Sequence, residues 1–131
     1  MKKIILLSLL VSVVIYAQDT EQNKRIETMQ NLEIGMETIL KGLMYNNKNI
    51  LIKGVDELGE NAKHIDAFNI KNDKDRNFKP KKYAETQSKV VTALAEDVLT
   101  SFSKGDRRRS VDNFKKLQNQ CMNCHSLIRK W

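Results

Sequence analysis

Apolar side chains recur every three or four positions in four stretches of the chain, and charged and amide side chains fill the positions between them. This spacing lines up the apolar side chains along one face of an α-helix. The pattern predicts helices over residues 21–46, 51–68, 81–103 and 107–130. Between these stretches the sequence carries no alternating Val, Ile and Thr runs bounded by turns, so no strand is predicted.

The breaks between the apolar patterns indicate how the helices are connected. Asn46 and Asn47 interrupt the pattern after the first stretch, and the charged segment 69–82 separates the second stretch from the third. Pro80 is the single proline of the chain. A proline biases the preceding residue, here Lys79, away from helical geometry. We therefore expect a linker before the third helix.

Short turns set the predicted architecture. Gly105 is expected to end the third helix, and Asp106 to cap the fourth with its carboxylate. Helices joined by short turns pack antiparallel, so the sequence predicts an all-α, antiparallel four-helix bundle with up-down-up-down connections. Gly35 and Gly42 lie seven residues apart on one face of the first helix. Either another backbone approaches them closely, or they are simply tolerated there.

The predicted apolar faces define the expected core. The face of the first helix comprises Ile26, Met29, Met36, Ile39, Leu40, Leu43 and Met44. The face of the last helix comprises Val111, Phe114, Leu117, Cys121, Cys124 and Ile128. Both cysteines of the chain are therefore expected on a seam between helices.

The N-terminal segment has the layout of a secretory signal peptide. Lys2 and Lys3 precede an apolar run over 4–16, and the small Ala17 follows. The run is shorter than the roughly 20 residues that span a bilayer. We expect cleavage after Ala17, leaving residues 18–131 as one exported domain in the periplasm with no integral membrane segment. Retention as an N-terminal anchor is the alternative.

Three possible roles of the two cysteines, a disulfide, a zinc site and a redox pair, fit the sequence poorly. An oxidising compartment favours a disulfide, yet one that closes a loop of two intervening residues stabilises little. A structural zinc ion needs four ligands, and the whole chain has two Cys and two His. A thioredoxin-like pair needs its first thiol at a helix N-terminus, whereas this pair lies near the C-terminal end of the last predicted helix.

The order Cys121, Cys124, His125 instead matches a c-type haem attachment signal. On a helix these three side chains project to the same side. Two thiols can then form thioethers with a haem, and the imidazole can reach its iron. Since c-type haem is attached outside the cytoplasm, the export signal agrees with this prediction. The porphyrin would fill the space between helices, and we expect the chain without haem to be poorly folded.

Together with the export signal and the four-helix pattern, this C-terminal motif resembles the class II c-type cytochromes, the cytochrome c′ and cytochrome c556 group. The resemblance covers the chain after the N-terminal segment, and only the haem motif is highly specific. "RIETM" is similar to the group's Arg-x-x-x-Met or Arg-x-x-x-Leu in the first helix, and "CHSLIRK" is similar to its usual ending.

The resemblance implies a role for each matching residue. Cys121 and Cys124 become the thioether anchors of one haem c, and His125 becomes the proximal ligand of its iron. Arg25 becomes a partner of a haem propionate, and Met29 the residue on the distal side of the iron. Arg129, four residues past the ligand histidine, matches the arginine of the ending.

The role of Met29 decides between the two functions that the resemblance implies, electron transfer and gas binding. Sulfur ligation to the iron gives a low-spin centre suited to single-electron transfer, and Met/His ligation raises the reduction potential. An open distal side gives a five-coordinate iron that binds NO or CO. A methionine on a helical stripe is also ordinary core packing, and Met36, on the same face, is a second candidate ligand. His64 is expected to be a surface or partly packed residue. A third possible function, that of a helical interaction protein without haem, applies only if the Cys121, Cys124, His125 motif is accidental.

The charge of the chain bears on its partners. The formal net charge is +7, and it falls to +5 without the N-terminal segment, which carries two lysines and no acid. The clusters "KDRNFKPKK" and "KGDRRRS" have few interleaved aromatic residues, so nucleic acid is not an expected partner. An acidic redox protein could dock on them, and the resemblance allows a homodimer. The sequence offers no paired carboxylates, nucleophile with base or phosphate loop, so an electron carrier rather than an enzyme is expected.

Overall fold

The computed structural model describes residues 2–68 and 77–129, and their side chains from Thr20 onward except those of residues 66, 67 and 129. These residues form α1 (Lys2–Met44), α2 (Lys48–Ala62), the 3₁₀ helix η1 (Lys63–Ala67), α3 (Pro80–Ser103) and α4 (Arg107–Arg129). All the described regular structure is helical, as the sequence predicts.

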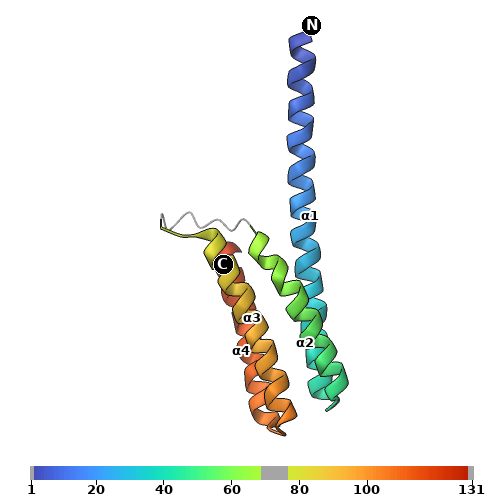
Figure 1. Ribbon diagram of the computed structural model, residues 1–131, viewed down its shortest axis with the longest axis vertical. Helices are drawn as coiled ribbons and strands as arrows, with labels where there is room; N and C mark the ends of the chain where they lie inside the picture. Colours follow the sequence, from blue (N-terminus) through green and yellow to red (C-terminus); the bar gives the residue numbers. More distant parts are fainter. Residues whose placement is uncertain (1, 69–76, 130–131) are drawn as a thin grey trace.

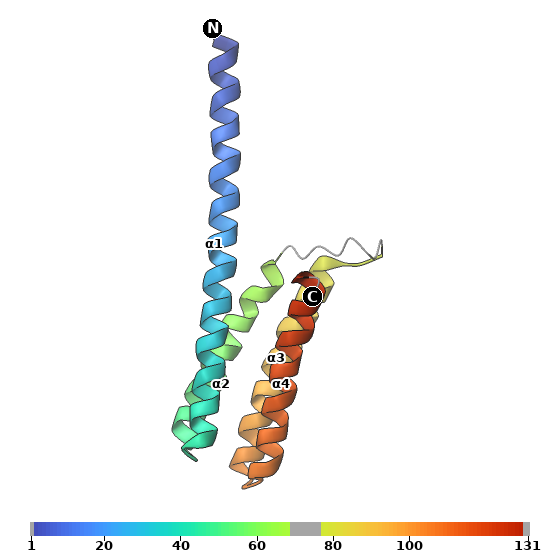
Figure 2. The ribbon, with the colours of Figure 1, turned by 180° about the vertical axis from the view of Figure 1, so that it is seen from behind.

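The helices pack as two antiparallel pairs, α1 with α2 and α3 with α4 (Figure 1). The pairs are joined mainly where α3 lies along α2 and η1, and the direct contact between α1 and α4 is slight. In both views α2 leans away from α1 and toward α3 at the end opposite the two tight turns, so α1 lies apart from α3 and α4 there (Figures 1 and 2). We call the two ends of the bundle the turn end (residues 45–47 and 104–106) and the open end (η1, the start of α3 and the end of α4). The antiparallel up-down bundle is confirmed.

The start of α1 extends beyond the bundle (Figure 2). The predicted cleavage point after Ala17 lies within this extension, and cleavage there stays a prediction. Within the described residues, none of the helices combines the length and the apolar character that crossing a membrane requires.

Local sequence explains the ends of the first three helices. Asn46 adopts a left-handed φ of 49°, and the side chain of Asn47 accepts hydrogen bonds from the backbone N–H groups of Asn49 and Ile50 at 3.0 and 3.2 Å. An asparagine oxygen in this place satisfies N–H groups that have no partner inside the helix. Lys79 is extended, with φ −108° and ψ 92°, because Pro80 begins α3.

The turn between α3 and α4 follows the prediction for Gly105 and Asp106. Gly105 has φ +82°, a left-handed conformation that glycine adopts without a steric penalty. The Asp106 carboxylate accepts a hydrogen bond from the Arg109 backbone N–H at 2.9 Å. Arg107 then links the two pairs at the turn end, because its Nε donates to Asn46 Oδ1 at 2.7 Å and its guanidinium lies 3.7 Å from the centre of the Phe102 ring.

Glycines bring α1 and α2 unusually close together. A Cβ atom at Gly42 would lie 2.6 Å from Leu51 N, and one at Gly35 would lie 2.9 Å from Leu58 Cβ. The close backbone approach is therefore the correct alternative for Gly35 and Gly42. Gly54 on α2 completes the contact, since a Cβ there would lie 2.5 Å from Ile39 N.

Gly54→Ala is expected to destabilise the protein by about 2 kcal/mol. The added methyl group would meet a backbone atom, which cannot move away as a side chain can. Overpacking of this kind destabilises a protein by about 1–3 kcal/mol, and the cost here should be near the upper end of that range. The better helix propensity of alanine stabilises the protein by only about 1 kcal/mol. Denaturant unfolding followed by circular dichroism measures the change. Gly59→Ala is the matched control on the same helix. Its Cβ would meet only Thr92 Cγ2 at 3.7 Å, so it should be neutral or stabilising. Equal stability of the two variants would contradict the close contact.

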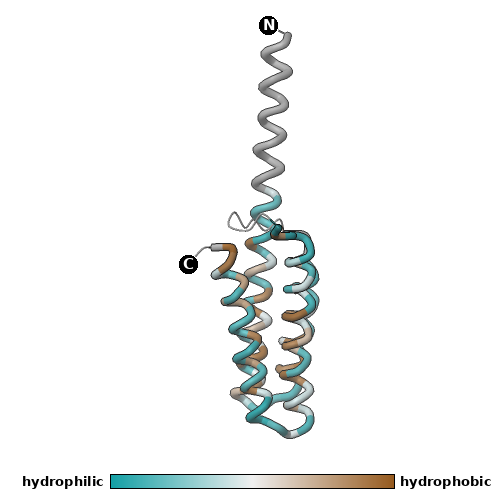
Figure 3. The backbone as a smooth tube through the Cα atoms, turned by 90° about the vertical axis from the view of Figure 1, so that its left-hand side faces the viewer, coloured by the Kyte–Doolittle hydropathy of each residue, from teal (hydrophilic) through white to brown (hydrophobic). Residues whose placement is uncertain are grey.

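The core lies between the two pairs, and hydrophobic residues recur along all four helices inside the bundle (Figure 3). The largest fully buried apolar side chains are Ile39, Leu51, Leu58, Val98 and Leu117. Four expected core residues are instead exposed, namely Ile26 (48%), Leu40 (41%), Met44 (73%) and Val111 (40%). On α4 the reason is that Ser110 and Asn113 face α3 in place of Val111 and are buried there.

Candidate cofactor site

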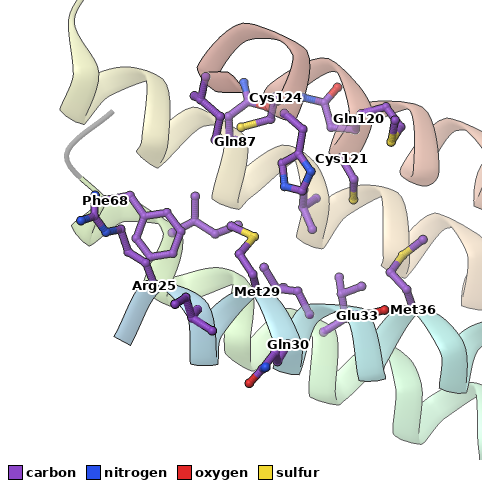
Figure 4. A pocket seen from close by; sticks show the side chains of 18 of the residues that line it. Arg25, Met29, Gln30, Glu33, Met36, Phe68, Gln87, Gln120, Cys121 and Cys124 are labelled. Atoms are coloured by element: carbon purple, nitrogen blue, oxygen red, sulfur yellow. Dashed lines mark hydrogen bonds between the residues drawn. The ribbon is translucent and has the colours of Figure 1, made fainter. Parts of the chain in front are cut away.

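A pocket of about 850 Å³ lies between the two helix pairs toward the open end (Figure 4). Small-molecule and cofactor pockets commonly have volumes of about 300–1,000 Å³. Buried apolar side chains contributed by α2, η1 and α3 line it, among them Leu58, Ile65 and Val91. Residues of α1 and α4 form the two facing walls. Because α1 and α4 hardly touch, the space between them is available to a ligand.

The α4 wall carries the predicted haem motif. Cys121, Cys124 and His125 all line the pocket and are all partly buried. They share this wall because residues three and four positions apart lie on one face of a helix. Both cysteines are free thiols, and in Figure 4 the Cys121 sulfur is directed across the pocket toward α1.

Both thiols are held in the protonated state. Burial raises the pKa of Cys121, and the neighbouring Cys124 raises it further. Burial also raises the pKa of Cys124, while the nearby Tyr83 side chain lowers it in part. A redox-active cysteine is activated by the opposite shift, because the thiolate is the reactive form. The environment therefore disfavours a thioredoxin-like role for this pair.

The α1 wall carries the predicted distal residues. Arg25 and Met29 lie one helical turn apart, are partly buried and line the pocket opposite α4. Figure 4 shows the Met29 side chain extending from α1 into the pocket. Met36, two turns further along, lines the same pocket.

The structure thus brings together five of the six predicted site residues, from two helices almost a hundred positions apart in the sequence. The sixth, Arg129, is the last residue of α4, and its side chain lies outside the described part of the chain. His64 is exposed in η1 and is not one of the residues that line the pocket.

Two pairs of side chains that the sequence analysis did not single out connect α3 to α4 at the pocket. Gln120 Nε2 donates a hydrogen bond to Gln87 Oε1, and both residues line the pocket. Gln87 is only 8% exposed. Across the same seam, Tyr83 lies close enough to Cys124 for each side chain to shift the pKa of the other. The one available signal was spacing, since Tyr83 and Gln87 lie one turn apart on α3, as do Gln120 and Cys124 on α4.

Comparisons with known proteins add no relative to this picture. No protein-family model matches the chain, and neither the curated proteins nor the solved structures contain a significant match. Across the residues that the structure describes, no three His, Cys, Asp or Glu side chains cluster as potential metal ligands.

Proposed function

We propose that this chain is an exported monohaem c-type cytochrome of the class II group that carries single electrons in the periplasm. The observation that supports it most is the placement of Cys121, Cys124 and His125 on one wall of the pocket, with Met29 and Arg25 on the facing wall. No other set of described residues combines two thiols and an imidazole at one cavity.

The residues present fit a covalently bound haem. The pocket has the volume of a cofactor site, and its inner wall is formed by the buried Leu58, Ile65 and Val91. Cys121 and Cys124 would hold the group through their two thiols, which are reduced and kept protonated by burial, and a haem would supply the two vinyl groups to which they attach as thioethers.

A haem bound here supplies an iron that accepts and releases one electron. The chain contributes the rest of the chemistry. Cys121 and Cys124 anchor the group to α4, and His125 offers a ring nitrogen to the iron. Met29 offers its sulfur from the opposite wall, and Arg25 offers a guanidinium to a propionate. Leu58, Ile65 and Val91 keep water from the inner side, and low polarity around a haem is one of the factors that set its reduction potential.

Gas binding by a five-coordinate iron is the second candidate. It is supported by the slight contact between α1 and α4, because few contacts hold the α1 wall close to the His125 side of the pocket. Five-coordination requires that the Met29 sulfur packs in the pocket without reaching the iron.

An acidic redox protein is the proposed partner, and the fold distinguishes the two basic clusters. Lys79, Lys81 and Lys82 are exposed at the start of α3, which belongs to the open end where the pocket lies. Arg108 and Arg109 are exposed at the turn end. The 24 residues of α3 separate the clusters by about 36 Å at 1.5 Å per residue. We propose that the partner docks on the lysines, because only they lie beside the pocket.

Haem staining tests the proposed function. The full chain, exported in a host that attaches c-type haem, is run on a denaturing gel and stained for haem. We expect a stained band and a haem absorption spectrum in the purified protein. His125→Ala should change the spectrum, whereas the matched His64→Ala should leave it unchanged. An unstained band from a well-exported chain would overturn the proposal.

A further inference from the structure

Gln87 places a buried amide in the inner wall of the pocket. It lies one turn before Val91 on α3 and is only 8% exposed. The other buried residues that line the pocket, Leu58, Ile65 and Val91, are apolar. Because buried polar groups in proteins are almost always hydrogen-bonded, the partners of this amide indicate its role.

The oxygen end of the amide is held by α4. Gln120 Nε2 donates a hydrogen bond to Gln87 Oε1, and both side chains lie between α3 and α4 (Figure 4). A glutamine amide has an acceptor oxygen at one end and an NH2 group with two donor hydrogens at the other. Because Gln120 binds the oxygen, it also fixes the direction of the nitrogen end.

The nitrogen end of the Gln87 amide has no partner in the described part of the chain. Gln87 Nε2 forms no hydrogen bond with any of these residues. It is also not sealed in the packing, since among the described side chains the one sealed polar atom without a partner is Glu57 Oε2. The small exposed fraction of Gln87 therefore includes this nitrogen, at a residue that lines the pocket. The inner wall thus offers a hydrogen-bond donor to whatever the pocket binds.

A second buried amide between α3 and α4 shows the contrast. Asn113 Nδ2 donates to Ser101 Oγ at 3.0 Å and to the Asp97 carbonyl oxygen at 3.2 Å, so its nitrogen has acceptors on α3. None of these three residues lines the pocket. An amide that only joins the two helices therefore leaves no donor unpaired, and Gln87 differs from it at the pocket.

We propose that Gln87 presents the N–H end of its amide to the haem proposed for this pocket and raises its reduction potential, and that Gln120 is a positioning residue that holds the amide in this direction. The inference rests on the proposed function. Reduction adds one electron to the haem, and the N–H end of an amide dipole carries partial positive charge, so it stabilises the reduced state. The apolar wall strengthens this interaction, because charges and dipoles interact more strongly where the dielectric constant is low. Hydrogen bonds and burial around a haem are among the factors that set its potential.

Gln87→Leu tests the proposal, because leucine has a similar size and no amide dipole. Potentiometric titration of the haem-loaded full chain should show a lower reduction potential for this variant. Loss of one buried donor should change the equilibrium constant of reduction by about fivefold, which corresponds to about 40 mV for a one-electron couple. Gln118→Leu is the matched control and should leave the potential unchanged, since Gln118 lines the same pocket from α4 but is exposed. Equal potentials for wild type and Gln87→Leu would overturn the proposal.

Gln120→Leu tests the positioning role. This variant keeps the Gln87 amide but removes the group that holds its oxygen, so the potential should again fall. The double variant Gln87→Leu, Gln120→Leu should have the potential of Gln87→Leu alone, because Gln120 acts only through Gln87. A further fall in the double variant would contradict the positioning role of Gln120.

Denaturant unfolding of the same haem-loaded variants separates the proposal from a purely structural role. We expect Gln87→Leu to keep a stability near that of the wild type while its potential falls. If the two glutamines only joined the helices, the variant would instead lose stability at an unchanged potential, and the proposal would be wrong. Haem staining decides the proposed function separately. An unstained chain overturns the proposed function and this inference with it, whereas a stained chain with an unchanged potential overturns this inference alone.

Discussion

Replacing both cysteines, in the double variant Cys121→Ala, Cys124→Ala, is expected to abolish haem staining and to leave a chain with less helix and no cooperative melting. The reason is the pocket of about 850 Å³ between the two helix pairs. Cavities in a core cost about 24 cal/mol per Å³, so leaving even about a third of this volume unfilled costs about 7 kcal/mol. The whole stability of a typical domain is only about 5–15 kcal/mol. Circular dichroism, at one temperature and during melting, measures both effects.

The single variant Cys121→Ala is the control for this experiment. One thioether from Cys124 still anchors the haem, so the denatured chain should stain and the helices should remain. A double variant that keeps the helical content and the sharp melting of the wild type would show that the pairs close on each other without a cofactor. That result would contradict the proposal that the haem is needed for folding. The staining result tests only whether the haem is covalently attached through the cysteines.

The helices could be predicted from the sequence because local rules determine them. Asn47, Pro80, Gly105 and Asp106 each act within one turn of chain, and each lies where its chemistry requires. The rotation of α4 was predicted less well, since Val111 is exposed and its neighbour Ser110 is buried. Apolar periodicity cannot show that a serine will find the Val98 carbonyl on another helix.

The same distinction applies to the site. Cys121, Cys124 and His125 form a local motif, and the helix alone places them on one face, so they could be predicted. The resemblance added Arg25 and Met29, and the fold brings both to the same pocket. Tyr83 could not be predicted, because its closeness to Cys124 depends on the alignment of α3 with α4. That alignment is set by polar pairs that no apolar pattern reveals.

Met29→Ala is expected to convert the protein from an electron carrier into a gas-binding haem protein. In the ferric wild type, a sulfur-to-iron absorption band near the red edge of the spectrum should report the Met29 ligand. The variant should lose this band, show a broad high-spin spectrum and bind CO in the reduced state. Its reduction potential should fall, because Met/His ligation raises the potential. Absorption spectra with and without CO, together with a potentiometric titration, measure these changes.

Met36→Ala is the matched control, because Met36 lies on the same helix and lines the same pocket. It should keep the band and the potential of the wild type. Loss of the band in Met36→Ala alone would assign the ligand to Met36 and leave Met29 as packing. A wild type that has no such band and binds CO directly would favour the gas-binding function, with Met29 filling the distal side. Each result is specific because, among the residues that line the pocket, the methionines opposite α4 are Met29 and Met36. Substituting them one at a time changes the candidate ligand while the thioether anchors and His125 stay in place.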